Sequence, residues 1–305
     1  MNSRIPYLTV LIWFGTALMG CNQPTPVTQN AEQTVEPILK IQAVGTKYYV
    51  NNKFGANCSN SGAGTATTQP WCDFTPANTK TFAAGDSILL ARGATWTQKM
   101  TPSGSGTSAN WINIDAYGSG DKPIIRGNSI ASDRTVILEN ADYWKISNLE
   151  IAYAGEGILV HYTTLGHQGL QFSSLYIHDI LGIKNGIPAQ TDYPTIWNSN
   201  AIGIGFGTPA VPTASQWVVK DIIIDNVEAY KTNGIYTLIS SNNTTDLSDY
   251  PSTSIQGVTI RNSYLHDAQG PVLALENTSD IYFVSNLVDA VGLVYEPQGT
   301  TSFFV

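Results

Sequence analysis

From about Trp111 to the C-terminus the chain repeats one short pattern: a β-rich couplet, a polar Asn or Ser corner, an apolar strand, and a glycine followed by another apolar strand. The polar corner recurs at Asn148, Ser174, Asn226, Asn262 and Asn286. These corners are 26, 52, 36 and 24 residues apart, so a unit of about 25 residues fits, with one doubled step and one insertion. The strands are short and no helical period of 3.6 is present. The pattern predicts a coil of parallel strands in which each unit is one rung.

The composition agrees with an extracytoplasmic β-rich protein. Of the 305 residues, 42% are hydrophobic, enough to bury a substantial core, and only 12% are charged. Asn, Ser, Thr and Gly, the residues of tight turns, are plentiful. The net charge of −8 disfavours nonspecific nucleic-acid binding and provides no polybasic membrane patch.

The N-terminus predicts export. Arg4 precedes an apolar run from Tyr7 to Met19, which is short for a membrane-spanning helix and typical of a signal peptide, here residues 1–21. The ending Leu-Met-Gly-Cys resembles a bacterial lipobox, which implies lipidation of Cys21 and a location on the extracytoplasmic side of the cell envelope. A plain cleaved signal, with secretion, is the alternative. Residues 22–44, rich in Gln, Thr, Pro and Asn, are expected to form a flexible linker.

The cysteines fit this compartment. With Cys21 assigned to the lipid, Cys58 and Cys72 remain as an even pair that closes a short loop. In an oxidising compartment such a pair predicts a disulfide.

Several segments before and within the first rungs resemble right-handed parallel β-helix proteins, the pectin-lyase-like group of bacterial polysaccharide lyases and glycoside hydrolases. The resemblance is carried by TKYYVNN (46–52), TTQPWCDF (67–74), AAGDSILLARGATW (83–96) and WINIDAYGSGDKPIIRG (111–127). It implies an all-β, single-stranded right-handed β-helix over residues 45–305. Residues 45–110 would supply a short N-terminal capping segment and the first strands, and residues 111–305 the rungs.

The C-terminal end departs from that family pattern. The sequence stops at Val305 within an apparent strand, whereas members of the family finish with further rungs and a cap. An open coil end exposes an apolar cross-section and unpaired strands. We therefore expect that the C-terminal cap is missing and that the chain is truncated.

The strand after each glycine corner is expected to floor the binding groove. These strands are assigned to Gly157–Tyr162, Ala201–Phe206, Gly234–Ser240, Pro271–Asn277 and Gly292–Pro297. Alternation then points His161, Tyr236, Glu276 and Glu296 outwards, with His161 and Tyr236 as substrate-binding candidates. Glu276 and Glu296 fall at corresponding places on neighbouring rungs, where paired carboxylates suit acid catalysis or a calcium ion. Alternatively, both carboxylates cap strand ends in water.

A second row of candidates precedes this strand. His178-Asp179, Tyr230-Lys231 and His266-Asp267 occupy equivalent positions, so they are expected to form a ladder along one rim. Lys231, His178 or His266 could abstract the proton beside a uronate carboxyl group, which is the first step of a polysaccharide lyase. The alternative is a structural corner in which the Asp accepts hydrogen bonds from turn amides.

Trp197 and Tyr193 lie in an irregular stretch that interrupts the rungs, and their ring faces could bind sugar. The motifs typical of polygalacturonases and pectate lyases are absent, as are a P-loop, a Gly-x-Ser-x-Gly elbow and His-Glu-x-x-His. The sequence therefore favours a monomeric protein that cleaves an acidic polysaccharide by β-elimination. Hydrolysis by paired carboxylates and glycan binding without catalysis are the alternatives.

Overall fold

The computed structural model describes residues 45–130, 132–181, 199–206, 216–239, 255–276 and 278–292, with the backbone alone for Phe206, Ile239 and Glu276. No helix within these ranges is long and apolar enough to cross a membrane. The predictions for residues 1–44, including Cys21, lie outside them. So do those for Tyr193, Trp197, Glu296 and the C-terminal end.

The described residues form three long sheets and one two-stranded sheet, all of parallel strands. The eight-stranded sheet consists, in order, of β1 (Lys47–Val50), β3 (Ser87–Ala91), β6 (Ile112–Tyr117), β9 (Trp144–Ser147), β12 (His167–Ser173), β15 (Val219–Asp225), β18 (Ile255–Arg261) and β21 (Thr278–Val284). The seven-stranded sheet consists of β4 (Thr95–Trp96), β7 (Ile124–Arg126), β10 (Glu150–Ala154), β13 (Tyr176–Ile180), β16 (Glu228–Thr232), β19 (Tyr264–His266) and β22 (Leu287–Asp289). The five-stranded sheet consists of β8 (Arg134–Glu139), β11 (Glu156–His161), β14 (Asn200–Phe206), β17 (Gly234–Ile239) and β20 (Leu273–Glu276).

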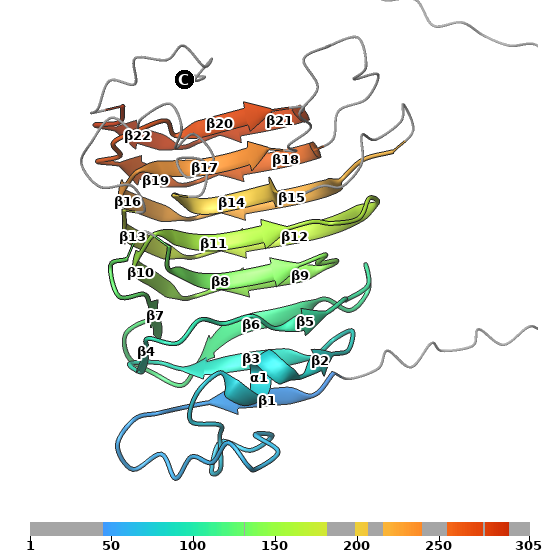
Figure 1. Ribbon diagram of the computed structural model, residues 1–305, viewed down its shortest axis with the longest axis vertical. Helices are drawn as coiled ribbons and strands as arrows, with labels where there is room; N and C mark the ends of the chain where they lie inside the picture. The colour runs from blue at the N-terminus through green and yellow to red at the C-terminus, as the bar shows by residue number, and fades with distance from the viewer. Residues whose placement is uncertain are drawn as a thin grey trace, which may run out of the picture. The chain divides into compact units, whose positions relative to one another are not determined.

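Consecutive strands belong to different sheets, so the chain passes through the three sheets in turn. Strands β9, β10 and β11 make one rung, and β12, β13 and β14 make the next, each strand pairing with its counterpart one rung earlier. Figure 1 shows the strands of successive rungs stacked along the coil, with the chain coloured from blue at β1 to red at β22. This is the predicted right-handed parallel β-helix, and the predicted fold class is confirmed.

The core consists of apolar columns that run from rung to rung. In the eight-stranded sheet one column is formed by Ile88, Ile114, Ile146, Phe172, Ile224 and Ile260, and all six side chains are buried. Each fully buried side chain of this kind contributes roughly 1.5–3 kcal/mol relative to exposure. Stacking of like side chains on neighbouring rungs thus explains why β-branched residues recur at the same phase of the repeat.

The polar corners adopt a left-handed backbone conformation. The φ angles of Asn148, Ser174, Asn226 and Asn262 lie between 54° and 59°. Asn tolerates this region better than most residues, and its side chain bonds the neighbouring rung, as Asn148 Nδ2 does to Asp115 Oδ1 at 2.7 Å. In the last rung the left-handed residue is Ser285 rather than the predicted Asn286, so that marker was placed one residue too late.

The N-terminal segment packs aromatic side chains against the first rungs. Helix α1 (Thr75–Thr79) lies in this segment, and β2 (Thr81–Phe82) pairs with β5 (Ser103–Gly104). Trp71 stacks on Tyr48 with ring centroids 5.1 Å apart. The predicted disulfide between Cys58 and Cys72 is confirmed, and it closes the loop that carries Trp71.

Candidate functional site

A pocket with a volume of about 460 Å³ lies on the outer face of β8 and β11, the first two strands of the five-stranded sheet. Alternation along the two strands points Ile137, Glu139, Leu159 and His161 into it. The backbone register places Ile137 beside Leu159 and Glu139 beside His161. The floor is therefore an apolar pair next to an ionisable pair.

Segments from other parts of the coil complete the pocket. Thr97 and Lys99 follow β4, while Arg126, Gly127 and Asn128 form the end of β7 and the turn after it. Ser132, Asp133 and Arg134 lead into β8. The walls thus come from the seven-stranded sheet and its connections, and the floor from the five-stranded sheet.

His161 and Glu139 interact directly. Nδ1 of His161 lies 3.0 Å from Oε2 of Glu139, a distance at which Nδ1–H donates to the carboxylate. This bond selects the tautomer whose Nε2 carries a lone pair. Among the described residues Nε2 has no hydrogen-bond partner, so it is available to a substrate.

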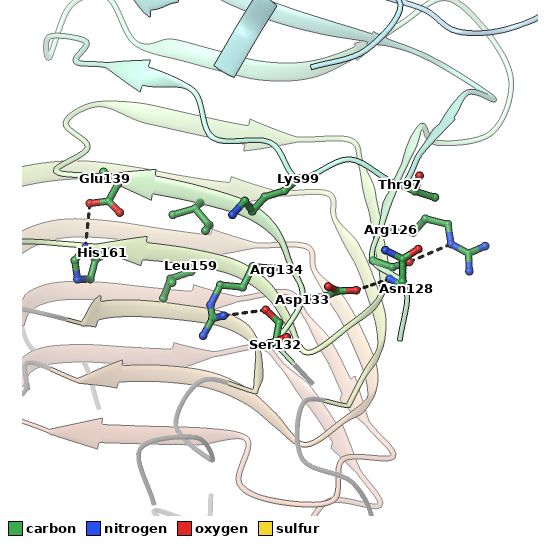
Figure 2. Close-up of a pocket in the computed structure, with 12 residues that line it drawn as sticks. Thr97, Lys99, Arg126, Asn128, Ser132, Asp133, Arg134, Glu139, Leu159 and His161 are labelled. Carbon is green, nitrogen blue, oxygen red and sulfur yellow. Dashed lines mark hydrogen bonds and ion pairs between the residues drawn. The ribbon is translucent and has the colours of Figure 1, made fainter. Parts of the chain in front are cut away.

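Two cationic groups face the same floor. Figure 2 shows Lys99 and Arg134 directed toward the region of Leu159, with Glu139 and His161 beyond it. Arg134 is held by a 3.0 Å hydrogen bond from Nη1 to the carbonyl oxygen of Ser132. Lys99 Nζ has no hydrogen-bond or ion-pair partner in the part of the chain that the structure describes. Two such cations beside a histidine suit a ligand with a carboxylate group.

The remaining charged groups of the pocket are already engaged. Arg126 points away from the others in Figure 2, and its guanidinium lies 4.6 Å from the ring centroid of Tyr153. Asp133 Oδ2 accepts a 2.6 Å hydrogen bond from the backbone N–H of Asn128, which ties the carboxylate to the turn. The groups left to act on a ligand are therefore Lys99, Arg134 and the His161–Glu139 pair.

Glu156 lies next to this site in the backbone register, opposite Arg134. Its side chain is fully buried, and neither carboxyl oxygen has a hydrogen-bond partner of ordinary geometry among the described residues. Burial raises its pKa from 4.5 to about 8, against the opposing effects of Arg134 and the Asn200 side chain. A protonated Glu156 leaves the positive charge of Arg134 uncompensated at neutral pH.

The predicted histidine ladder is confirmed as an arrangement, and it lies on the seven-stranded sheet. The register places His178, Tyr230 and His266 side by side on β13, β16 and β19. The rings of Tyr230 and His266 are nearly parallel, at 3° and 5.0 Å, and His178 stacks on Tyr230 at 18° and 5.1 Å. Lys231 follows Tyr230 within β16, where it is exposed and has a φ angle of 49°.

Carboxylates lie near both nitrogens of each ladder histidine. His178 Nδ1 lies 2.7 Å from Asp179 Oδ2, and Nε2 lies 3.1 Å from Glu150 Oε1. His266 repeats this arrangement, with Asp267 at 2.8 Å and Glu228 at the longer distance of 3.5 Å. His178 agrees with the structural alternative, because carboxylates bond both of its nitrogens. Nε2 of His266, in contrast, is buried without a hydrogen-bond partner among the described residues.

Tyr236 was predicted to face outwards, and that orientation is wrong. Its side chain is fully buried and lies in a core column with Ile202 and Leu273. Gly234 pairs with Asn200, which sets the register of β17 and turns Tyr236 inwards. Buried in the core, Tyr236 cannot contact a polysaccharide on the surface.

The predicted site residues therefore do not converge on one groove. Lys231, His178 and His266 lie on the seven-stranded sheet, and among the described side chains only His161 of the predicted set lines the pocket. The backbone of Glu276 is in β20, but its side chain and Glu296 lie outside the description. Calcium binding by this glutamate pair therefore stays a prediction. Among the described residues no group of three or more His, Cys, Asp or Glu side chains could hold a metal ion.

Sequence reasoning missed Lys99, Arg134 and Glu139. Glu139 ends β8 at the position where His161 ends β11, so the strand register carried a usable signal. Lys99 gave no such signal, because it reaches the pocket from an irregular segment after β4.

No protein-family model matches the chain, and no curated protein matches its sequence. Among solved structures, the native GH136 lacto-N-biosidase from Eubacterium ramulus is similar with a TM-score of 0.59 and 19% identity, over 74% of this chain and 42% of that one. A rhamnogalacturonan lyase matches with a TM-score of 0.45 and 12% identity, over 81% of this chain and 63% of that one. An alginate lyase from Paenibacillus sp. matches with a TM-score of 0.34 and 17% identity, over 70% and 93%.

This chain spans less than half the length of the lacto-N-biosidase. At 19% identity the similarity establishes the fold and not the activity. The chain therefore shares the parallel β-helix fold of a carbohydrate-active enzyme, and its chemistry has to be argued from its own pocket.

Proposed function

We propose that this protein binds an acidic polysaccharide in the pocket over β8 and β11 and cleaves it by β-elimination. The observation that carries the proposal is the placement of Lys99 and Arg134 beside the His161–Glu139 pair in one pocket. An acidic protein needs a local basic cluster to hold a uronate, and these two cations supply one.

The reaction assigns a role to each group. Lys99 and Arg134 neutralise the uronate carboxylate, which acidifies the C5 proton and stabilises the charge that develops when this proton leaves. Nε2 of His161 takes the C5 proton, while Glu139 holds Nδ1–H and stabilises the imidazolium. The C4–O bond then breaks, a C4=C5 double bond forms, and the imidazolium returns the proton to the departing oxygen. No water is consumed.

The apolar floor of the pocket also supports the binding of a sugar ring. Ile137 and Leu159 form a small nonpolar surface between the charged groups, suited to the C–H face of a sugar ring. Protonated Glu156 avoids a negative charge beneath Arg134, so the field in the pocket stays attractive to an anion.

The proposal is tested by incubating the protein with alginate, pectate and chondroitin, with and without calcium, and recording the ultraviolet absorbance of unsaturated uronates. Lys99→Ala should raise KM about 10- to 100-fold, because it removes a charge-assisted contact to the substrate. Lys47→Ala, an exposed lysine on β1, should leave the kinetics unchanged.

Three results would contradict elimination at this pocket. Absence of the absorbance change on all three polymers would exclude it for these substrates. Release of reducing ends without the absorbance change would favour hydrolysis by paired carboxylates, the alternative for which Glu276 and Glu296 are the candidates. Loss of activity in Lys231→Ala, with none in Lys99→Ala, would move the site to the seven-stranded sheet.

We also propose that the signal in residues 1–21 exports the protein and that Cys21 is lipidated. Both follow from the lipobox-like ending and the linker composition. Fractionation tests this directly: wild-type protein should sediment with membranes, and Cys21→Ala should be found in the soluble fraction. Equal distribution of the two would contradict the lipid anchor.

A further inference from the structure

A second constellation lies outside the pocket lining, at the corners between the five-stranded and eight-stranded sheets. Asp142 precedes β9. One rung later Thr164 lies between β11 and β12, and His167 is the first residue of β12. Asp142 Oδ2 lies 3.1 Å from His167 Nδ1, and Thr164 Oγ1 lies 2.8 Å from His167 Nε2. The three side chains are thus linked in one continuous chain of hydrogen bonds.

The imidazole of His167 is firmly positioned. Asp142 Oδ1 also accepts the backbone N–H of Gln168 at 2.9 Å, which fixes the carboxylate. The fully buried ring of Tyr162 stacks on the imidazole at 4.7 Å and 26°. Trp217 Nε1 donates to the carbonyl oxygen of His167 at 2.9 Å. His167 is therefore held from three sides, with 9% of its surface exposed.

Thr164, in contrast, is exposed. Asp142 accepts the proton of Nδ1, so Nε2 is the acceptor for the Thr164 hydroxyl. A competing acceptor, Asn140 Oδ1, lies farther from this hydroxyl, at 3.2 Å. The shorter contact to His167 favours the orientation in which the imidazole withdraws the hydroxyl proton.

Backbone donors are also available at this corner. Thr163 N–H donates to Asn140 Oδ1 and Gly166 N–H to the carbonyl oxygen of Trp217. Between them, the N–H groups of Thr164 and Leu165 have no acceptor within the described part of the chain. The N–H of a nucleophile and that of its neighbour are the kind of donors that stabilise an oxyanion.

We propose that Thr164, His167 and Asp142 form a hydrolytic centre for short-chain carboxylic esters, separate from the pocket over β8 and β11. Thr164 is the nucleophile, His167 the general base and acid, and Asp142 a positioning residue. The methyl group of Thr164 crowds its hydroxyl, which limits the acyl group to a small one such as acetyl. The exposed corner admits an ester carried on a large molecule.

The reaction balances without a redox partner. Thr164 Oγ attacks the acyl carbon, and its proton passes to His167 Nε2. The imidazolium gives this proton to the departing alcohol, and the acyl group remains as an ester on Thr164. His167 then takes a proton from a water molecule, whose oxygen attacks the acyl carbon. The bond from the acyl carbon to Thr164 Oγ breaks, the imidazolium gives its proton to Oγ, and the acid leaves.

The full-length protein is tested with 4-nitrophenyl acetate and, separately, with a fluorophosphonate probe whose attachment site is mapped by mass spectrometry. The probe should modify Thr164, and Thr164→Val, which replaces the hydroxyl by a methyl group of similar shape, should abolish labelling. Thr164→Ser should retain or increase it. Thr163→Val is the matched control, and it should label as the wild type does, because the Thr163 side chain contacts Asn140 and not His167.

Asp142→Asn tests positioning apart from folding. The amide oxygen can still accept the Gln168 N–H, but the amide nitrogen would donate to Nδ1 and reverse the tautomer. Labelling and ester hydrolysis should fall about 100-fold or more with an unchanged melting temperature. His161→Ala should leave labelling of Thr164 intact, which separates this centre from the proposed lyase site.

The proposal is overturned if the probe leaves Thr164 unmodified while 4-nitrophenyl acetate turns over equally in wild type and Thr164→Val, because an exposed imidazole would then account for the hydrolysis. It is also overturned if no turnover and no labelling occur. In either case the three residues act as a structural link between rungs.

Discussion

His161 Nδ1 lies 3.0 Å from Glu139 Oε2, and the two residues stand opposite each other on adjacent strands. The strand register alone therefore creates the pair, with no contribution from a flexible loop. In the proposed elimination this pair supplies the base and its orienting carboxylate.

The pair predicts a graded loss of activity. His161→Ala should lower the rate of unsaturated uronate formation about 10²- to 10⁴-fold, because the base is lost. Glu139→Gln should cause a smaller loss, since the imidazole remains but its tautomer is no longer fixed. Both rates are measured at saturating substrate, with melting temperatures as the folding control. Activity that is unchanged in His161→Ala would exclude this residue as the base.

Because of Glu156, we expect the free energy of unfolding to fall as the pH rises. Its pKa is 4.5 in an ordinary environment and about 8 in the fold, so between these values the folded state binds the extra proton. The stabilising contribution is complete below about pH 4.5 and is lost as the pH rises through about 8, by on the order of 5 kcal/mol at most. This contribution is measured by urea unfolding of the wild type and of Glu156→Gln at several pH values between about 4.5 and 8.

The Glu156→Gln variant should show a flatter pH dependence, because the amide does not ionise. Glu139→Gln is the matched control: its carboxylate is 60% exposed, so this substitution should leave the pH dependence in place. An equal slope in wild type and Glu156→Gln would show that Glu156 ionises in the fold without penalty.

We expect the ring of Tyr236 to contribute to the stability of the fold and its hydroxyl to contribute little. The hydroxyl is buried without a hydrogen bond of ordinary geometry to a described residue. Tyr236→Phe should therefore leave the free energy of unfolding unchanged within about 1 kcal/mol, whereas Tyr236→Ala should cost about 3–5 kcal/mol through the cavity it creates. Chemical denaturation compares the two. A large loss in Tyr236→Phe would reveal a hydrogen bond to the hydroxyl.

We expect the thermal stability of the protein to depend on whether the Cys58–Cys72 disulfide is formed. Cys58 and Cys72 are 14 residues apart, and opening such a loop costs about 3 kcal/mol in the chain-entropy account. Cys58→Ser combined with Cys72→Ser should lower the melting temperature to that of the reduced wild type. A reductant should have no further effect on the double variant. If it lowered the melting temperature of that variant, the stabilisation would come from another source.

The fold could be predicted from the sequence because the repeated pattern identifies equivalent positions in successive rungs. Four of the five corner residues chosen from the sequence have left-handed φ angles, and the predicted strand Ala201–Phe206 lies within β14. Similar side chains at equivalent positions of successive rungs bury their surfaces by stacking on one another. The local sequence pattern therefore sufficed to predict the overall fold.

Two parts of the site did not follow. In β17 the neighbours Ile235, Tyr236 and Leu238 are all apolar, so alternation offered two solutions, and the pairing of Gly234 with Asn200 selects one. The pocket draws Lys99 from a segment far from His161 in the chain. Such a contact depends on the three-dimensional path of the coil, which periodicity does not encode.

The pocket over β8 and β11 occupies two neighbouring strands of a five-stranded sheet. The strands that continue this sheet, β14, β17 and β20, supply none of its lining residues. Because each rung of a solenoid contacts only its neighbours, rungs beyond β14 could be gained or lost without moving a pocket residue. Chain length and site geometry are thus separable traits, and a lineage could alter the reach of the coil along a polymer while its chemistry stays constant.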